Sequence, residues 1–223
     1  MKRIIFWICF LIILALIVWG LVVAMNRPVA VNGVPIGTVS PVLSSDHVYG
    51  QNPTTGYVNA KVTLIEYSDF QCPACEVFYY SVAKLLQDEP TTTLRFIYRH
   101  FPLSQHANAR PAAMAAEAAG LQGKFWEMYE LLFKNHAEWT ELANSSPIFV
   151  GYATSLGLDI AKFTADIKNP ALVAHIDADL ESGQIAGINS TPTFFINGKA
   201  IVNPSSYADF KKLIDQAASS SSL

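Results

Sequence analysis

The chain has 223 residues, of which 51% are hydrophobic and 15% are charged, and its formal net charge is -3. This length supports one substantial hydrophobic core and a separate anchor segment. The weak negative charge and the lack of a basic patch exclude a nucleic-acid-binding protein.

The chain begins with an apolar segment. Ile4 to Met25 is a run of 22 residues without a charge, which is long enough for a helix to cross a hydrocarbon core of ~30 Å. Lys2 and Arg3 precede this run, so positive-inside counting places the N-terminus in the cytoplasm. Residues 1–25 are therefore predicted to be a cytoplasmic stub and an uncleaved transmembrane anchor. Val22-Val23-Ala24 leaves signal-peptide cleavage open as an alternative.

Residues 26–56 contain Pro, Gly and Ser with almost no charge. This composition predicts an extracytoplasmic linker, with a short β segment near Val29 to Val34. Whether the apolar segment is cleaved or retained, the rest of the chain is expected in an oxidising compartment, where a disulfide persists.

The first strong strand pattern, Lys61 to Tyr67, is followed by Cys72-Pro73-Ala74-Cys75 and a helical pattern over residues 73–87. This order of strand, Cys-x-x-Cys and helix is typical of a redox-active thiol pair. Cys72 would lie at the helix start, where free N–H groups favour a thiolate, so it is the predicted nucleophile and Cys75 the resolving thiol. Two alternatives exist. A structural zinc site usually needs four ligands, but Cys9 is the one further cysteine in the sequence. The second alternative is a purely structural disulfide.

Glu66 is an unusual residue for an otherwise apolar strand. It precedes Cys72 by six positions, so its carboxyl group could be buried below the thiols and exchange a proton with them. A strand residue that points to solvent fits the alternating pattern equally well, and the sequence leaves both options open.

The remaining elements follow in order. A strand over residues 91–98 completes a parallel βαβ unit and places the cysteines at the carboxyl end of a strand. Residues 105–187 contain only helical patterns and are predicted to be an inserted helical subdomain. Asn197-Gly198 predicts a hairpin between strands 193–196 and 200–202. A last helix begins after Ser206, and residues 218–223 are predicted to be a disordered tail.

Aromatic side chains and histidines are further candidates for function. An aromatic stripe is assigned mainly to the core, with a substrate-contacting face as the alternative; it comprises Phe125, Trp126, Tyr129, Phe133 and Trp139. The histidines at positions 100, 106, 136 and 175 lack metal-ligand spacing such as His-x-x-x-His, so no metal site is predicted. They are interpreted as ordinary histidines, with a position of His100 or His106 near the thiols as the alternative.

Three stretches carry a resemblance to a known family: EYSDFQCPAC at 66–75, GKFWEM at 123–128 and STPTFFING at 190–198. They resemble the thioredoxin-fold, DsbA-like thiol:disulfide oxidoreductases over residues 57–217. The resemblance implies an α/β thioredoxin-like fold with an inserted all-helical subdomain, here preceded by one N-terminal transmembrane helix. No cofactor is expected.

The resemblance also implies roles for individual residues. Cys72 would be the attacking thiol, Cys75 the resolving thiol and Glu66 the buried acid, while Thr191-Pro192 would form a cis-proline loop that binds substrate. Ala74 departs from the pattern, because the best-known oxidising members have a histidine between the cysteines. With fewer groups to stabilise the thiolate, the couple is expected to be less oxidising.

The resulting expectation is a membrane-tethered, extracytoplasmic oxidoreductase that introduces disulfides into secreted or envelope proteins. The resemblance implies reoxidation by a quinone-linked membrane protein of the DsbB or VKOR kind. Two alternatives remain open: a disulfide reductase or isomerase on the same fold, and a peptide-binding chaperone module.

Overall fold

The computed structural model describes residues 30–31, 34–35, 37–39, 46–49 and 60–220. In these ranges no helix has both the length and the apolar character that a membrane crossing requires. The predicted anchor, Ile4 to Met25, lies outside the described residues and stays a prediction.

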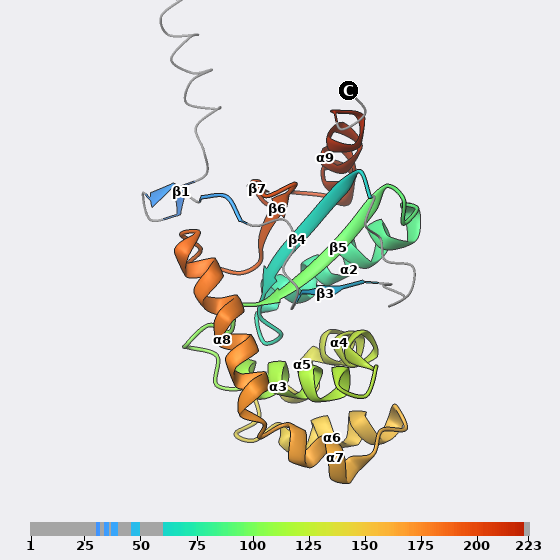
Figure 1. Ribbon diagram of the computed structural model, residues 1–223, viewed down its shortest axis with the longest axis vertical. Coiled ribbons are helices and arrows are strands. Elements are labelled where there is room, and N and C mark those ends of the chain that lie inside the picture. The colour runs from blue at the N-terminus through green and yellow to red at the C-terminus, as the bar shows by residue number, and fades with distance from the viewer. Residues whose placement is uncertain (1–29, 32–33, 36, 40–45, 50–59, 221–223) are drawn as a thin grey trace, which may run out of the picture.

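A five-stranded sheet with the order β3-β5-β4-β6-β7 forms the centre of the molecule (Figure 1). Strands β4 (Val62–Ser68) and β5 (Leu94–His100) pair in parallel and are joined by helix α2 (Pro73–Asp88), which confirms the predicted βαβ unit. Every residue of β4 is buried, because this central strand is covered on both faces of the sheet.

The alternating side chains of β4 belong to two cores. Leu64 packs on the face that α2 and the C-terminal helix cover, whereas Ile65 and Tyr67 pack on the opposite face. Since successive side chains of a strand point to opposite sides, Glu66 shares the face of Leu64. The sequence alone could not choose between a buried and an exposed Glu66, and the structure places it in the interior with no exposed surface.

Part of the predicted linker belongs to the folded domain. Strand β3 (His47–Val48) pairs antiparallel with β5 and forms one edge of the sheet. Thr38 forms an isolated bridge with Lys199 near the other edge. The prediction of a linker over the whole of residues 26–56 was therefore wrong at these positions. A short edge strand pairs through its backbone, so its sequence need not contain a hydrophobic run that would reveal it. The predicted β segment is present as β1 (Ala30–Val31) and β2 (Val34–Pro35).

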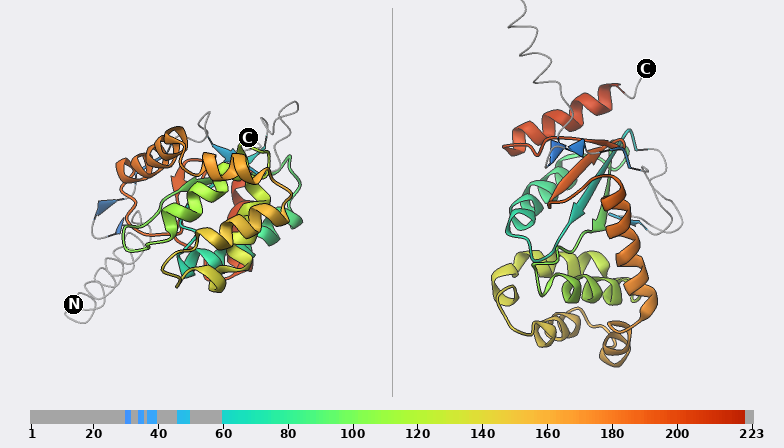
Figure 2. Two further views of the ribbon diagram at one scale, coloured as in Figure 1. Left: turned by 90° about the horizontal axis from the view of Figure 1, so that it is seen from below. Right: turned by 90° about the vertical axis from the view of Figure 1, so that its left-hand side faces the viewer.

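The chain between β5 and β6 contains helices and no strand in the structure, as predicted. Most of these helices lie beyond the ends of β4 and β5, and the last of them runs back beside the sheet (Figure 2). The helices are α3 (Ala109–Gly120), α4 (Phe125–Lys134), α5 (His136–Trp139), α6 (Ser146–Ser155), α7 (Ile160–Asp166) and α8 (Pro170–Ile185). The aromatic stripe lies mainly in the core: four of its rings are buried, and Trp126 is partly buried. This confirms the core assignment.

The chain returns to the sheet through β6 (Thr193–Ile196) and β7 (Lys199–Ala200). Asn197 and Gly198 have φ angles of 50° and 78°, the left-handed values that a two-residue hairpin turn requires. Helix α9 (Tyr207–Ser220) ends the described chain. The prediction of a disordered tail from residue 218 was wrong for residues 218–220, because the Ser219 and Ser220 hydroxyls donate to carbonyls one turn back and support another helical turn.

Candidate active site

The two cysteines lie where β4 gives way to α2. Cys72 is the N-cap of α2 with extended backbone angles, and Pro73 occupies the first helical position. Pro suits this position because its fixed φ matches the helix and its missing N–H would have had no helical partner. The Cys72 residue is 7% exposed and Cys75 is fully buried, while Pro73 and Ala74 between them are exposed. Of the two sulfurs, Cys72 is therefore the one near the surface.

The surroundings of Cys72 favour its thiolate. The pKa of Cys72 is lowered to about 5, chiefly by a hydrogen bond from the Cys75 thiol, while burial acts in the opposite direction. The Thr191 side chain and the backbone N–H groups of Cys75 and Ala74 add to the lowering. These N–H groups belong to the first turn of α2, where helical geometry leaves them without intrahelical partners.

Cys75 has the opposite character. Burial raises its pKa well above the ordinary value, and the neighbouring Cys72 and Glu66 raise it further. Both thiols are free, so the structure represents the reduced dithiol. At neutral pH the pair therefore consists of one thiolate, at Cys72, and one protonated thiol, at Cys75, that donates a hydrogen bond to it.

Glu66 is buried in the central strand between Tyr98 of β5 and Phe194 of β6. Neither carboxyl oxygen has a hydrogen-bond partner, and the same is true of the buried hydroxyls of Ser68, Tyr98 and Tyr129. Burial raises the pKa of Glu66 to about 8, against a lowering effect of the Ser68 hydroxyl, and the charge of Cys72 contributes to the rise. Below that pH the carboxyl group keeps its proton and can donate it.

Thr191 and Pro192 face the sulfur of Cys72 from the loop before β6. The peptide bond between them is cis, as the resemblance implied. The Cys72 thiol donates to the Thr191 carbonyl oxygen at 3.5 Å. The Thr191 hydroxyl is buried and has no partner in the dithiol form, and a thiolate at Cys72 would supply an acceptor for it.

Further polar residues hold the loop before Cys72, and sequence reasoning missed them. The Asp69 carboxylate accepts hydrogen bonds from the Gln71 and Leu103 backbone N–H groups and from His106 Nδ1, at 2.7 to 2.9 Å. His136 Nε2 lies 3.0 Å from the Gln71 carbonyl oxygen. No spacing rule relates these residues, because the helical insertion brings His106 and His136 back to the loop only in the folded chain.

The Gln71 side chain connects the thiol loop to the helical insertion. Its amide donates to the Thr140 carbonyl, and its oxygen accepts from the Asn108 backbone N–H. The insertion therefore forms part of the site's wall. In the described part of the chain, the one group of three residues with metal-ligand geometry is His47, Glu117 and His175, which contains neither cysteine.

Comparison with known proteins places the chain in a family. The family model described as thioredoxin matches residues 49–216. The chain belongs to the thioredoxin family. Its fold is that of the DsbA-type thiol-disulfide oxidoreductases, which confirms the fold and the family resemblance derived from the sequence.

Two solved structures illustrate the similarity. BdbD from Bacillus subtilis, in its oxidised form, aligns with a TM-score of 0.69 and 24% identity, covering 82% of this chain and 98% of that one. Alpha-DsbA1 from Wolbachia pipientis aligns with a TM-score of 0.69 and 22% identity, covering 81% of this chain and 94% of that one. The alignments include the helical insertion, since both span almost the whole of the compared chains.

One relative is named as a sodium/proton antiporter and is much longer than this chain. The Na(+)/H(+) antiporter NhaA 1 of Salinispora arenicola is 38% identical over 155 residues. The match covers 69% of this chain and 22% of that protein. The chain thus spans less than a quarter of the length of the curated relatives it matches, and the shared part shows common ancestry of that segment only.

Proposed function

We propose that this protein is a membrane-tethered, extracytoplasmic thiol:disulfide oxidoreductase that introduces disulfides into secreted or envelope proteins. One observation carries the proposal: Cys72 has a lowered pKa at the start of α2, beside a buried, protonated Cys75 and against the cis Thr191–Pro192 loop. A low-pKa thiol next to a resolving thiol is the arrangement that thiol–disulfide exchange requires.

The exchange begins with the Cys72–Cys75 disulfide. A substrate thiolate attacks Cys72, the bond between the two enzyme sulfurs breaks, and Cys75 leaves with the electron pair. Glu66 donates a proton to Cys75, because its carboxyl group is protonated below a pKa of about 8. The product is a mixed disulfide between Cys72 and the substrate.

A second substrate thiolate then attacks the substrate sulfur of this mixed disulfide. Cys72 leaves as a thiolate, which its lowered pKa favours. The substrate loses two electrons and gains a disulfide, and the enzyme gains the two electrons as its dithiol. Thr191 and Pro192 are the proposed substrate-binding residues, since an extended substrate segment next to Cys72 would lie against their loop.

The dithiol must be reoxidised to act again. The proposed reoxidant is a quinone-linked membrane protein of the DsbB or VKOR kind, which the resemblance suggests. Attachment through Ile4 to Met25 would keep Cys72 on the outer side of the membrane, close to such a partner. The flanking charges of Lys2 and Arg3 support that orientation.

The main rival is a reductase or isomerase on the same fold, and Ala74 is the feature that favours it. A histidine between the cysteines would stabilise the thiolate further, and Ala74 cannot. Weaker stabilisation of the thiolate makes the dithiol a better reductant. The chaperone alternative differs in kind, because it would not need the thiols.

The equilibrium of the purified protein with glutathione separates these functions. We expect a reduction potential between about -180 mV, the value of protein disulfide isomerase, and about -120 mV, the value of DsbA. A value near -270 mV, the potential of thioredoxin, would contradict a net oxidase. Cys72→Ser should abolish disulfide formation in a reduced substrate, whereas Cys9→Ser should not. A Cys72→Ser variant that still prevents substrate aggregation would instead support the chaperone.

A further inference from the structure

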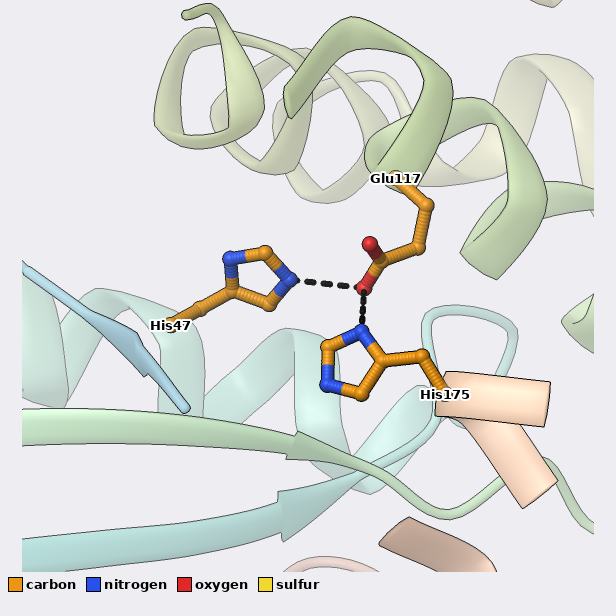
Figure 3. Close-up of side chains that lie close together, drawn as sticks. All are labelled: His47, Glu117 and His175. Carbon is orange, nitrogen blue, oxygen red and sulfur yellow. Dashed lines mark hydrogen bonds and ion pairs between the residues drawn. The ribbon is translucent and has the colours of Figure 1, made fainter. Parts of the chain in front are cut away.

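Three histidines from separate parts of the chain converge on one carboxylate oxygen. His47 comes from β3, His100 from the end of β5, His175 from α8 and Glu117 from α3. The distances to Glu117 Oε1 are 2.6 Å from His47 Nε2, 2.9 Å from His100 Nε2 and 3.1 Å from His175 Nδ1. Figure 3 shows the His47 and His175 rings pointing at this oxygen from two sides.

The cluster lies inside the protein. The Glu117 side chain is 5% exposed and the His100 side chain 1%, while His47 and His175 are 20% and 16% exposed. The cluster therefore brings imidazole nitrogens and a carboxylate oxygen together in the interior, and the ligand atoms of His47, His175 and Glu117 lie within 4.8 Å of one another.

We propose that His47, His175 and Glu117 form a binding site for a divalent transition metal of the zinc class. Imidazole nitrogen with one carboxylate oxygen is a donor set that zinc accepts in tetrahedral sites. Calcium and magnesium prefer oxygen ligands, so a site in which two of the three protein ligands are nitrogen atoms disfavours them.

The ligand atoms of the three residues are close enough to bind one ion after their side chains shift. Ligands at 2.0–2.2 Å from a tetrahedral zinc lie about 3.3 Å apart. The ligand atoms of His47, His175 and Glu117 already lie within 4.8 Å of one another. When the ion replaces the N–H hydrogens, the 2.6 Å contact from His47 to Glu117 would lengthen by about 0.7 Å and the 3.1 Å contact from His175 by about 0.2 Å.

A second observation is independent of the convergence. His175 Nε2 and Asp179 Oδ1 are both buried and have no hydrogen-bond partner. They lie 4.0 Å apart, one helical turn from each other on α8. A histidine that binds a metal through one nitrogen usually directs the other toward a carboxylate, which fixes the ring and raises its basicity. Asp179 is placed to be that carboxylate for His175.

The His47 ring is also held in place. It stacks on Phe125, with ring centroids 3.5 Å apart and an angle of 9° between the planes. Its neighbour Asp46 pairs with Arg99 of β5 at 2.7 Å. An ion at this point would connect the edge strand β3 to helices α3 and α8 of the insertion. It would act as a structural clamp that shares no residue with the thiol pair.

Zinc binding by the full-length chain tests the proposal. All three cysteines are first changed to serine, because the thiols of Cys9, Cys72 and Cys75 would bind zinc themselves. In this parent we expect one Zn²⁺ per chain by competition with a chromophoric chelator. Co²⁺ should give the visible bands of a tetrahedral nitrogen and oxygen site. Zn²⁺ should also raise the Tm, whereas Mg²⁺ should not.

Two double variants of this parent provide the comparison. His47→Gln/His175→Gln should weaken Zn²⁺ binding at least tenfold and remove the Tm increase. The matched variant His106→Gln/His136→Gln removes two histidines outside the cluster and should bind like the parent. A parent that binds no Zn²⁺, or a His47/His175 variant that binds as tightly as the parent, overturns the proposal. If that variant does not fold, the Co²⁺ spectrum of the parent decides, and the absence of tetrahedral bands overturns the site.

Discussion

Glu66 and Cys75 show how burial sets the chemistry of single residues. Each lies in the core below Cys72, and burial raises the pKa of both. A carboxyl group that keeps its proton up to about pH 8 is suited to protonate a leaving sulfur at neutral pH. The energetic cost of burying Glu66 without a hydrogen-bond partner therefore has a functional explanation.

Replacement of Glu66 by Gln tests this role. Gln has a similar shape but cannot transfer a proton, so mixed-disulfide formation should slow by about 100-fold at pH 7, within the usual range for acid catalysis. The wild-type advantage should disappear above pH 8, because the Glu66 carboxyl group ionises as the pH rises through its pKa of about 8. Stopped-flow mixing with a reduced, fluorescent peptide measures both effects.

Glu66→Asp provides the control, since it retains a carboxyl group in the same pocket. Partial recovery of the rate in this variant is expected. Equal rates for wild type and Glu66→Gln across the pH range would show that the residue does not participate.

The sequence predicted the thiol pair but not the histidine cluster, for a physical reason. Cys72 and Cys75 are joined by one helical turn, so local geometry relates them. Glu66 needed the resemblance as well, because alternation in a strand does not say which face is buried. His47, His100 and His175 come together only after β3 has paired with β5 and α8 has packed against the sheet. Residue spacing along the chain does not predict contacts between such distant segments.

Helix α8 packs closely against the sheet at a glycine. At Gly183, an added Cβ would lie 2.7 Å from two ring atoms of Phe101 and 3.0 Å from Tyr67. Both rings are buried. The missing side chain therefore allows α8 to lie directly on the aromatic side chains that cover the sheet.

Gly183→Ala should lower the free energy of unfolding by about 1–2 kcal/mol, because overpacking outweighs the better helix propensity of Ala. Gly151 is the matched control, since it lies within α6 and nothing is within 4 Å of an added Cβ. Gly151→Ala should raise the free energy of unfolding by about 0.5–1 kcal/mol. Urea denaturation of the two variants measures the contrast, and a stabilised Gly183→Ala would refute the close-packing argument.

Most elements were predictable because their patterns are local. The Asn197-Gly198 hairpin and the caps Asp159 and Asn169 are examples, and both cap side chains accept a backbone N–H in the structure. Strand β3 was not predictable, since a strand of two residues has too short a pattern and depends on the edge of β5.

At the scale of the whole molecule, two short segments of the N-terminal region contact opposite edges of the sheet. Gly37 N–H donates to the Ala186 carbonyl and Val39 N–H to the Gly198 carbonyl, while β3 pairs with β5. Residues 37–39 and strand β3 thus attach the N-terminal region to the rest of the domain. If residues 1–25 span a membrane, these attachments limit how far the thiols can move from its surface.

Thiol labelling of intact cells tests the predicted membrane orientation. In a chain with Cys9→Ser and Cys75→Ser, Cys72 is the remaining thiol, and a membrane-impermeant reagent should label it without lysis. The chain should also resist extraction at alkaline pH. The same chain without residues 2–25 should be labelled only after lysis. Labelling of the full chain only after lysis would contradict an extracytoplasmic domain.

The pH dependence of Cys72 alkylation in the reduced protein tests the central claim most directly. Cys9→Ser removes the competing thiol, and buried Cys75 should react slowly. Since only the thiolate reacts, the rate should rise with pH through a midpoint near the Cys72 pKa of about 5. A midpoint near 8.5, the value of an ordinary cysteine, would contradict an activated thiol at position 72 and with it the proposed exchange reaction.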